Sequence, residues 1–481
     1  MKVNVINRTG IRYGYMREYA THRAYQELER YYGPYELFTK VSTYFRTASE
    51  LPSYIGKGVY SDIDYIIQSM TENFGQNANL AKSLFGGGKG NTFTKLYIST
   101  LGEMFERIIG AISYYSYRDQ FIFGTANELA SKYEICGPDE IAIFAPEQFE
   151  DDNFIFEKFT DQTALNWIPM HRLVSGAQFL VPAQLLFIYY PMETEGETHI
   201  GYATSGGLSL HDDREQALFH GITECIERDA INVRWYNRIP AEEVPLRKLE
   251  GLTKYGTGVL EHSRKTGRSL RAFRHNIDLE AYPVVTTVSF DEDLSKFSFC
   301  AGGGVGASLT EAVESSFREY GQSELNLKSL FYNPTWYSSR SMIDLFGFDK
   351  FSLEEMTLFY EIVPYYGLKA NRKKLDWYFN GDEVSDAELS DSGRLMQGSD
   401  YAHLIEVLGE VDIDPLVMEL TPDGFSSIAL MKSYLPQLTS AFLPNRPCFG
   451  HPRFYDLAYS RGLVDAPLTY ADLNPEPLPF P

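Results

Sequence analysis

Three stretches of the chain place pairs of carboxylates inside an otherwise apolar helical pattern. In LFHGITECIERD (218–229), apolar residues recur on one helix face, while Glu224 and Glu227 share another face with His220. The stretches STLGEMFER (99–107) and EAVESSFREYGQ (311–322) repeat this spacing of Glu, two residues, then Glu or Gln. The pattern therefore predicts three helices, each with a polar stripe along one side.

The stripes gather acidic side chains with a few polar and basic neighbours. Their members are Ser99, Glu103, Glu106 and Arg107; Glu224, Glu227 and Arg228; and Glu311, Ser315, Glu319 and Gln322. Carboxylates on buried helix faces are costly unless they are paired or hold a cation. Oxygen ligands favour Mg²⁺, which binds few carboxylates together with substrate phosphates, so a nucleotide is expected in the same cleft. Each Arg could hold a carboxylate or a phosphate in forked hydrogen bonds.

Two other interpretations of the stripes, a solvated helix surface and a di-iron centre, fit the sequence less well. A single ExxER segment is typical of a solvated helix surface, but three such segments favour a shared site. A carboxylate-bridged di-iron centre would need Glu-x-x-His on two helices, and the stripes contain no such pair. His220 is interpreted as a packing or supporting residue rather than a general base, and Cys225 as a core residue.

Runs rich in β-branched and aromatic residues predict strands around these helices. Strands are expected at 166–190 with a turn at Ser175 and Gly176, at 283–290 and at 297–301, and shorter ones at 141–144, 404–407 and 428–430. Helical patterning covers 19–32, and the first striped helix should start near Thr94. Asp212 and Asp213 supply a plausible cap for the central one. The expected fold class is α/β (mixed α+β), with β-sheets flanked by the striped helices.

Gly-rich segments at 86–90 and 302–308 are predicted to be turns that open the first and third helices. Neither has the spacing of a P-loop or of a dinucleotide-binding fingerprint. Lys89 in the first segment is therefore either a phosphate ligand or an exposed turn residue.

Net charge, apolar runs and cysteine spacing exclude several classes of partner and of binding site. The 481 residues carry a net charge of −22, which argues against nucleic acid or an anionic membrane as the main partner. The N-terminus lacks a signal-peptide pattern, and the most apolar run, 179–190, is too short to span a bilayer. Four cysteines lie far apart without a CxxC pair, so neither a zinc site nor a disulfide framework is indicated. A soluble protein of the reducing cytoplasm is expected.

The chain divides into three predicted parts. Residues 1–85 form a Tyr-rich region that either packs on the rest or contacts a partner, and residues 86–400 carry the three stripes. Residues 380–400 are polar and acidic, as in a surface loop. Residues 401–481 end in Pro477, Pro479 and Pro481, and this alternation favours an extended, polyproline-like tail.

The segments that contain the three stripes resemble motifs of a known protein family. The runs GGKGNTFTKLYISTLGEMFER, TSGGLSLHDDREQALFHGITECIERDA and GASLTEAVESSFREYGQSE are similar to three motifs of YcaO proteins, and the likeness extends from about residue 86 to the C-terminus. The resemblance implies a YcaO-type fold and an enzyme that uses ATP and Mg²⁺ to phosphorylate a backbone amide oxygen of a peptide.

Site residues are carried over from the resemblance by position. It implies that Mg²⁺ and the ATP phosphates are bound by Glu103, Glu106, Glu224, Glu227, Glu311 and Glu319. It implies further nucleotide contacts from Lys89, Ser99, Arg107, Ser209, Asp212, Gln216, Arg228 and Gln322. Four positions depart from the family pattern, and these departures could retune the nucleotide site. They are Gly206 and Asp212 in place of Asn, Gln216 in place of Glu, and Ser315 in place of a frequent Arg.

The terminal PxPxP of Pro477, Pro479 and Pro481 resembles azoline-forming cyclodehydratases such as that of microcin B17 synthetase, in which the chain end takes part in catalysis. The implied reaction converts Cys, Ser or Thr of a ribosomal precursor peptide to thiazoline or oxazoline in an antibiotic or toxin pathway. The implied partners are that peptide, an E1-like leader-binding protein and an FMN-dependent azoline dehydrogenase, with a homodimer inside a larger complex. Alternatives are a thioamide- or amidine-forming enzyme and a catalytically inactive scaffold.

Overall fold

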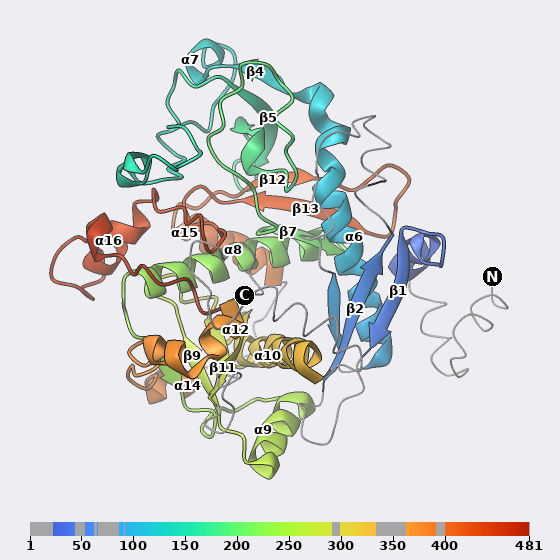
Figure 1. The fold of residues 1–481 in the computed structure, drawn as a ribbon, viewed down its shortest axis with the longest axis vertical. Helices are drawn as coiled ribbons and strands as arrows, with labels where there is room; N and C mark the ends of the chain where they lie inside the picture. The colour runs from blue at the N-terminus through green and yellow to red at the C-terminus, as the bar shows by residue number, and fades with distance from the viewer. Residues whose placement is uncertain are drawn as a thin grey trace.

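The computed structural model describes residues 23–43, 53–61, 65, 86–90, 92–290, 299–332, 362–390 and 400–480. Its three longest helices are α6 (Phe93–Tyr117), α8 (Arg214–Tyr236) and α10 (Leu309–Tyr332). The described strands form three antiparallel sheets around them. In Figure 1 the six-stranded sheet lies above α8, the four-stranded sheet lies beside α10, and the three-stranded sheet lies at the right. The three helices therefore meet at the centre of the molecule.

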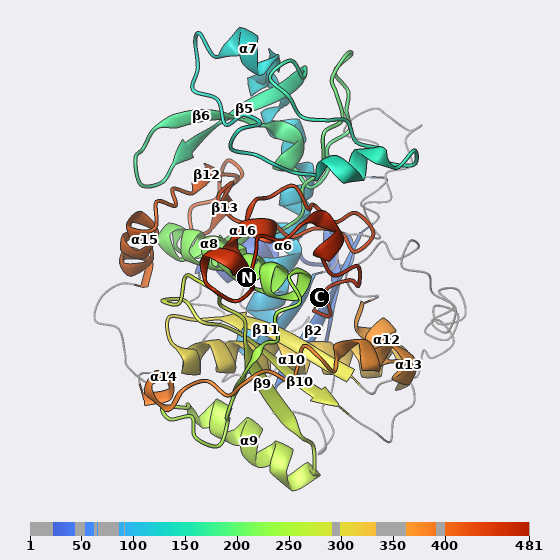
Figure 2. The same cartoon turned by 90° about the vertical axis from the view of Figure 1, so that its left-hand side faces the viewer.

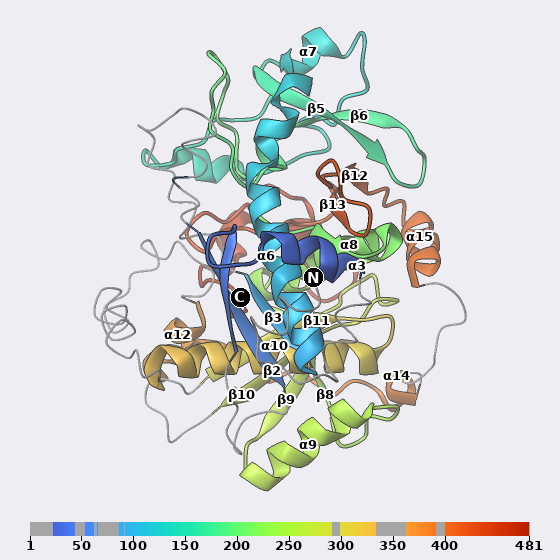
Figure 3. The same ribbon diagram turned by 90° about the vertical axis from the view of Figure 1, so that its right-hand side faces the viewer.

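The three-stranded sheet supports the first striped helix. Its strands, in order, are β1 (Phe38–Thr43), β2 (Tyr54–Tyr60) and β3 (Gly87–Gly90). Helix α6 packs on β2 and β3, and the short helix α3 (Arg23–Leu28) also packs on α6. Figure 3 shows α6 rising from this sheet toward the six-stranded one. One helix thus connects two of the three layers.

The other two sheets hold α8 and α10. The six-stranded sheet contains β4 (Ile122–Gly124), β5 (Leu165–Arg172), β12 (Leu416–Glu419), β13 (Ala429–Tyr434) and β7 (Leu208–His211), with β6 (Gln178–Pro182) paired to β5. The four-stranded sheet contains β11 (Phe299–Val305), β10 (Val284–Phe290), β9 (Leu270–Arg274) and β8 (Glu242–Val244). Helix α8 packs on β13 and β7, whereas α10 packs on β11 and β10.

Shorter helices cover the outside. They are α7 (Ala126–Leu129), α9 (Lys254–Thr266), α12 (Ile362–Gly367), α13 (Lys369–Arg372), α14 (Asp386–Ser390), α15 (Asp400–Glu410) and α16 (Arg453–Ser460). Figure 2 shows α7 and α9 at opposite ends of the molecule. None of the described helices combines the length and the apolar character that a membrane crossing needs. All four cysteines are free.

Local sequence sets the helix starts as predicted. The Thr92 side chain accepts a hydrogen bond from the Lys95 amide (3.2 Å) and caps α6, one residue before its first turn. The Asp213 side chain accepts from the Gln216 amide (3.0 Å) and caps α8. The predicted strands at 166–182, 283–290 and 428–430 correspond to β5, β6, β10 and β13, and β11 covers residues 299–301 of the strand predicted at 297–301. The prediction of a strand up to residue 190 is wrong, because β6 ends at Pro182 and Ala183–Leu185 forms a 3-10 helix. Gly176, with φ of +71°, provides the left-handed turn between β5 and β6.

The prediction that the two Gly-rich segments are turns is wrong. Gly87–Gly90 forms strand β3, and Gly302 to Gly304 lie within β11. A Cβ at Gly88 would overlap the backbone of Thr100 on α6, and a Cβ at Gly302 would overlap the backbone of Tyr320 on α10. The glycines are therefore needed where a striped helix lies directly on a strand.

Two short strand predictions are also wrong. Residues 404–407 belong to helix α15, whose Leu404, Val407 and Leu408 are buried at helical spacing. Residues 141–144 are extended but bond to a loop rather than to a strand, since the Gly450 amide donates to the Ile143 carbonyl (3.0 Å). In the expected loop at 380–400, residues 386–390 form α14 and residues 391–399 lie outside the described part.

The predicted helix at 19–32 is represented by α3 and the turn that follows it, and residues 19–22 are outside the described residues. The division at residues 85 and 400 stays a prediction. Strands β12 and β13, from the predicted C-terminal part, lie in one sheet with β5 and β7.

The close approach of α10 to β11 predicts a large cost for a methyl group at Gly302. Gly302→Ala should lower the free energy of unfolding by about 1–3 kcal/mol or more, because helix and strand backbones must separate. Gly258→Ala is the control: it lies on α9 with no neighbouring atom within 4 Å of an added Cβ, and should raise stability by about 0.5–1 kcal/mol. Urea denaturation measures both, and equal effects would contradict the packing.

Candidate active site

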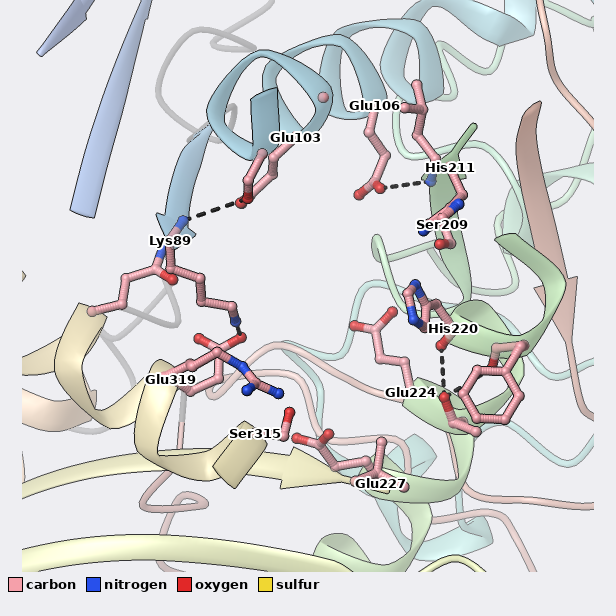
Figure 4. A pocket seen from close by; sticks show the side chains of 18 of the residues that line it. Lys89, Glu103, Glu106, Ser209, His211, His220, Glu224, Glu227, Ser315 and Glu319 are labelled. Atoms are coloured by element: carbon pink, nitrogen blue, oxygen red, sulfur yellow. Dashed lines mark hydrogen bonds and ion pairs between the residues drawn. The ribbon is translucent and has the colours of Figure 1, made fainter. Parts of the chain in front are cut away.

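A cavity of about 1170 Å³ lies where α6, α8 and α10 converge. Strands β3, β7 and β11 complete its wall, through Lys89, Ser209 and Gly303 among others. The site residues expected from the sequence that line it are Lys89, Ser99, Glu103, Glu106, Arg107, Ser209, Asp212, Glu224, Glu227, Arg228, Glu311, Glu319 and Gln322. Figure 4 shows carboxylates from all three helices pointing toward its centre. The fold thus brings together side chains more than 200 positions apart in the sequence.

On the α6 side, Arg107 lies between two carboxylates. Its guanidinium is 3.8 Å from Glu103 Oε1 and 4.0 Å from Glu106 Oε1. Glu106 Oε2 accepts a hydrogen bond from the Leu210 amide of β7 (3.0 Å). One oxygen of Glu106 is therefore fixed by backbone, while the cation nearby balances the two charges without tight hydrogen bonds.

On the α8 side, Glu224 is held in the same way. Its Oε2 accepts a hydrogen bond from the Gly207 amide (3.1 Å), and Arg228 Nη2 lies 4.0 Å from Oε1. Glu227 Oε1 would lie only 2.6 Å from a Cβ at position 303, so glycine there lets this carboxylate approach β11. Glu224 and Glu106 are thus each positioned by a backbone amide just before or within β7.

On the α10 side, Glu319 forms an ion pair with Lys89 of β3. The Lys89 amide also donates to Ser99 Oγ of α6 (3.4 Å). Glu311 accepts from the Ala307 amide (3.2 Å), so it caps the start of its own helix while its side chain lines the cavity. Lys89 is therefore a cavity residue rather than an exposed turn residue.

Burial disfavours the charged form of several cavity carboxylates in the ligand-free protein. Burial, opposed by Arg107 and reinforced by Glu103 and Glu224, raises the pKa of Glu106 to about 8. Burial also raises the pKa of Glu103 and of Glu227, and lowers the pKa of Lys89 to about 8. A bound cation would stabilise the charged forms of these buried carboxylates.

The donor set fits Mg²⁺ with a nucleotide. Within the described residues, no three His, Cys, Asp or Glu side chains lie close enough to hold a metal ion by themselves. Mg²⁺ commonly takes one or two carboxylates and fills its remaining positions with water and substrate phosphates. Spaced carboxylates from three helices, interleaved with Lys89, Arg107 and Arg228, suit such a shared arrangement.

Some site residues are not where the resemblance placed them, and others were missed. Gln216 lies in the first turn of α8 and is not among the residues that line the cavity. His211, 2.7 Å from Asp212 Oδ1, and Arg318 line it and were not predicted. The position of Arg318 directly before Glu319 on a striped helix was an available signal. His220 also lines the cavity, and burial together with His211 lowers its pKa to about 4.

The C-terminal tail runs into the core instead of along the surface. Tyr366 donates to the Pro477 carbonyl (2.5 Å), and Trp235 Nε1 of α8 donates to the Glu476 carbonyl (2.9 Å). Pro477 and Pro479 are buried, and neither lines the main cavity; Pro481 is outside the described residues. Leu478 and Phe480 line a small cavity of about 20 Å³ together with Arg228. Arg228 therefore lines both the main cavity and the small cavity beside the tail.

Comparison with known proteins identifies the family. Residues 87–439, most of the chain, match the family described as YcaO cyclodehydratase, ATP- and Mg²⁺-binding. The chain belongs to this family, and the family resemblance and the ATP and Mg²⁺ cofactors expected from the sequence are confirmed.

Solved structures share the fold at low sequence identity. A heterocyclase in complex with substrate and cofactor superposes with a TM-score of 0.71 at 19% identity, covering 95% of this chain and 57% of that one. YcaO from Methanopyrus kandleri bound with AMPPCP and Mg²⁺ gives 0.53 at 16%, covering 88% and 91%. A chain of the E. coli microcin synthetase McbBCD complex gives 0.57 at 13%, covering 92% and 97%. The predicted mixed α+β, YcaO-type fold is therefore confirmed.

One curated relative, an uncharacterised protein of Methanothermobacter thermautotrophicus, is 33% identical over 96 residues. These residues are 20% of this chain and 25% of that protein. The chain thus spans about half of the heterocyclase and a quarter of this relative.

The raised pKa of Glu106 predicts how ligand-free stability depends on pH. The folded carboxyl has a pKa of about 8 against about 4.3 when unfolded, so the folded state binds more protons in this window and stability falls as pH rises through it. Glu106→Gln keeps an acceptor for the Leu210 amide and should reduce this fall. Urea denaturation between about pH 5 and about pH 8.5 without Mg²⁺ or nucleotide tests it.

Glu215→Gln, an exposed change on α8, is the control for that series and should leave the pH dependence unchanged. An identical pH profile for Glu106→Gln and the unchanged protein would contradict the burial of charge at Glu106.

Proposed function

We propose that this protein is an ATP-dependent cyclodehydratase that converts Cys, Ser or Thr residues of a ribosomal precursor peptide to thiazolines or oxazolines. The observation that carries the proposal is that carboxylates and basic side chains from the three striped helices and β3 converge on one cavity, and that Arg228 also lines the small cavity beside the buried chain end. The carboxylates are those of Glu103, Glu106, Glu224, Glu227, Glu311 and Glu319, and the basic side chains are those of Lys89, Arg107 and Arg228.

The size of the cavity supports two substrates. Pockets for single small molecules usually measure about 300–1000 Å³, whereas this cavity measures about 1170 Å³. It therefore has room for a nucleotide and for a short peptide segment beside it. We therefore propose that a segment of the precursor peptide binds in this space.

The reaction requires little covalent chemistry from the protein. The substrate hydroxyl or thiol gives up its proton to solvent as its oxygen or sulfur attacks the preceding carbonyl carbon, and the carbonyl oxygen of the adduct takes the terminal phosphoryl group of ATP, leaving ADP. Loss of the amide proton and cleavage of the carbon–oxygen bond then expel phosphate and form the ring C=N bond. The sum is loss of one water per ring, coupled to hydrolysis of one ATP.

Within this reaction the chain positions and neutralises charge. Mg²⁺, when bound, would neutralise the phosphate charge that develops during transfer. Glu103, Glu106, Glu224, Glu227, Glu311 and Glu319 would hold it, and Glu106 and Glu224 are already oriented by backbone amides. Lys89, Arg107 and Arg228 would hold phosphate oxygens, with Ser99, Ser209, Asp212 and Gln322 around the nucleotide. Such preorganisation supplies most of the rate in phosphoryl transfer.

The position of the C-terminal tail supports the cyclodehydratase activity within this proposal. Pro477 and Pro479 are buried, and hydrogen bonds to the backbone of Glu476 and Pro477 fix the segment that leads to Leu478 and Phe480 beside Arg228. A chain end held at this place could orient the peptide amide against the nucleotide. This role for the tail supports ring formation over the thioamide, amidine and scaffold alternatives.

The proposed partners rest on the resemblance of the chain to YcaO cyclodehydratases and on the similar E. coli chain, which is part of the McbBCD synthetase complex. We therefore include in the proposal an E1-like leader-binding protein, an FMN-dependent azoline dehydrogenase and a homodimer within the larger complex. Exposed Tyr35, Tyr54 and Val59 in the N-terminal part offer an apolar contact surface. Four free cysteines suit the proposed cytoplasmic location.

Carboxylate variants test the ATP and Mg²⁺ role. Glu224→Gln and Glu227→Gln should each weaken Mg²⁺-dependent ATP binding by about 100-fold or more, because loss even of a group that supports a metal ligand costs 10- to 100-fold. Glu215→Gln on the same helix lies outside the cavity and should bind normally. Calorimetry measures the affinity. Unchanged affinity in both cavity variants would contradict the role of these carboxylates, and no Mg²⁺-dependent ATP binding by the unchanged protein would favour the scaffold alternative.

Tail variants separate turnover from nucleotide binding. Deleting residues 477–481 should nearly abolish turnover while leaving ATP affinity largely intact, because Leu478 and Phe480 line a small cavity with Arg228 and do not line the main cavity. Pro475→Ala, an exposed change just before the tail, is the control. Phosphate release and peptide mass, measured with the precursor and partner, report turnover. Full activity of the truncated protein would contradict a role of the tail in ring formation.

A further inference from the structure

Lys432 is a buried lysine behind the Glu224 wall of the cavity. It lies on β13 and is only 4% exposed. Its ammonium group donates to the carbonyl oxygens of Thr204 (3.1 Å) and Gly206 (2.7 Å). Lys432 does not line the main cavity but lines a separate cavity of about 70 Å³ with Cys225 and Arg228.

The two carbonyl groups belong to the turn that positions Glu224. The Gly207 amide, next in the chain, donates to Glu224 Oε2 (3.1 Å). The Gly207 carbonyl accepts from the Ser433 amide (2.8 Å), so β13 holds the turn with a side chain and a backbone group from adjacent residues. Gly207 has a φ of +74°, and a Cβ there would overlap the Ser433 carbonyl oxygen. The backbone of Gly207 is therefore closely packed against β13, and the carbonyl groups of Thr204 and Gly206 are held by Lys432.

The charge of Lys432 has no close acidic partner. Among the described residues it forms no salt bridge within 4 Å, and its ammonium is satisfied by neutral carbonyls. Burial lowers the pKa of Lys432 to about 8; Glu224 and Glu106 are the cavity carboxylates that favour its charged form, and Arg107 opposes it. Burying such a cation is costly, and an apolar side chain would fill the same space without this penalty. The position of the charge therefore points to a role at the adjacent site.

We infer that Lys432 is a positioning residue for the nucleotide site: it fixes the turn from Thr204 to Gly207 so that the Gly207 amide orients Glu224, and it places positive charge behind Glu224 and Glu106. This inference rests on the proposed binding of Mg²⁺ and ATP. The Gly206 carbonyl is the shorter of the two Lys432 contacts.

The test compares four changes at two neighbouring positions. Lys432→Met removes the charge and both hydrogen bonds, Lys432→Gln keeps a donor without charge, and Lys432→Arg keeps both. Ser433→Ala is the matched control, since the Ser433 hydroxyl is equally buried and has no hydrogen-bond partner among the described residues. Calorimetric titration with a non-hydrolysable ATP analogue, repeated over a series of Mg²⁺ concentrations, measures the nucleotide affinity and the Mg²⁺ requirement. Thermal unfolding of the ligand-free proteins is measured in parallel.

The expected result is a weaker nucleotide complex that needs more Mg²⁺. Lys432→Met should lower the affinity by about 10- to 100-fold and raise the Mg²⁺ concentration needed for half-maximal binding, as for other residues that orient metal ligands. Lys432→Arg should restore most of the affinity, Lys432→Gln should be intermediate, and Ser433→Ala should match the unchanged protein. If Lys432→Met does not fold, Lys432→Gln decides in its place.

Two failures are distinguishable. If the unchanged protein binds no Mg²⁺-nucleotide, the proposed function itself is wrong, and the inference falls with it. If the unchanged protein binds, and the Lys432 variants lose thermal stability but keep the same affinity and Mg²⁺ requirement, Lys432 serves only the fold and the inference is overturned.

Discussion

The crowding of carboxylates in one cavity is the constraint on which the rest of this structure depends. Side chains that repel one another and lose water must be held by the fold, because they would otherwise move apart or take up protons. Glu106 and Glu224 show how this is done: each has one oxygen bound to a backbone amide at or beside β7. The remaining oxygens are directed at the cavity, where a cation and phosphates can satisfy them.

The architecture follows from holding three helices at short range. Glycines in β3 and β11 allow α6 and α10 to lie directly on strand backbones, and α8 is fixed between β7, β13 and the tail. A buried ion network anchors the helix one residue beyond Arg228, where Asp229 is bound by Arg453 of α16 (2.9 Å) and Arg453 also binds Asp278 (2.9 Å). The geometry of the cavity therefore results from packing on all sides rather than from local sequence alone.

The sequence predicted the parts of the site that depend on short-range periodicity. Helical spacing placed Glu103 with Glu106 and Glu224 with Glu227 on common faces, and capping chemistry placed the starts of α6 and α8. The Gly-rich strands could not be recognised, because the reason for glycine is a helix that approaches from elsewhere in the chain. Lys432 was missed for a related reason, because it lies about 200 residues from Glu224 and carries no motif of its own. The short run at 404–407 was too brief to distinguish a buried strand from a buried helix face.

The central claim is that the cavity directs ATP onto a backbone amide oxygen of a peptide. The most direct measurement uses a precursor peptide whose backbone carbonyls carry a heavy oxygen isotope, incubated with the protein, its partner, ATP and Mg²⁺. The account predicts that the heavy isotope appears in the released phosphate, one atom for each ring formed. Rings that form while the released phosphate stays unlabelled would contradict it.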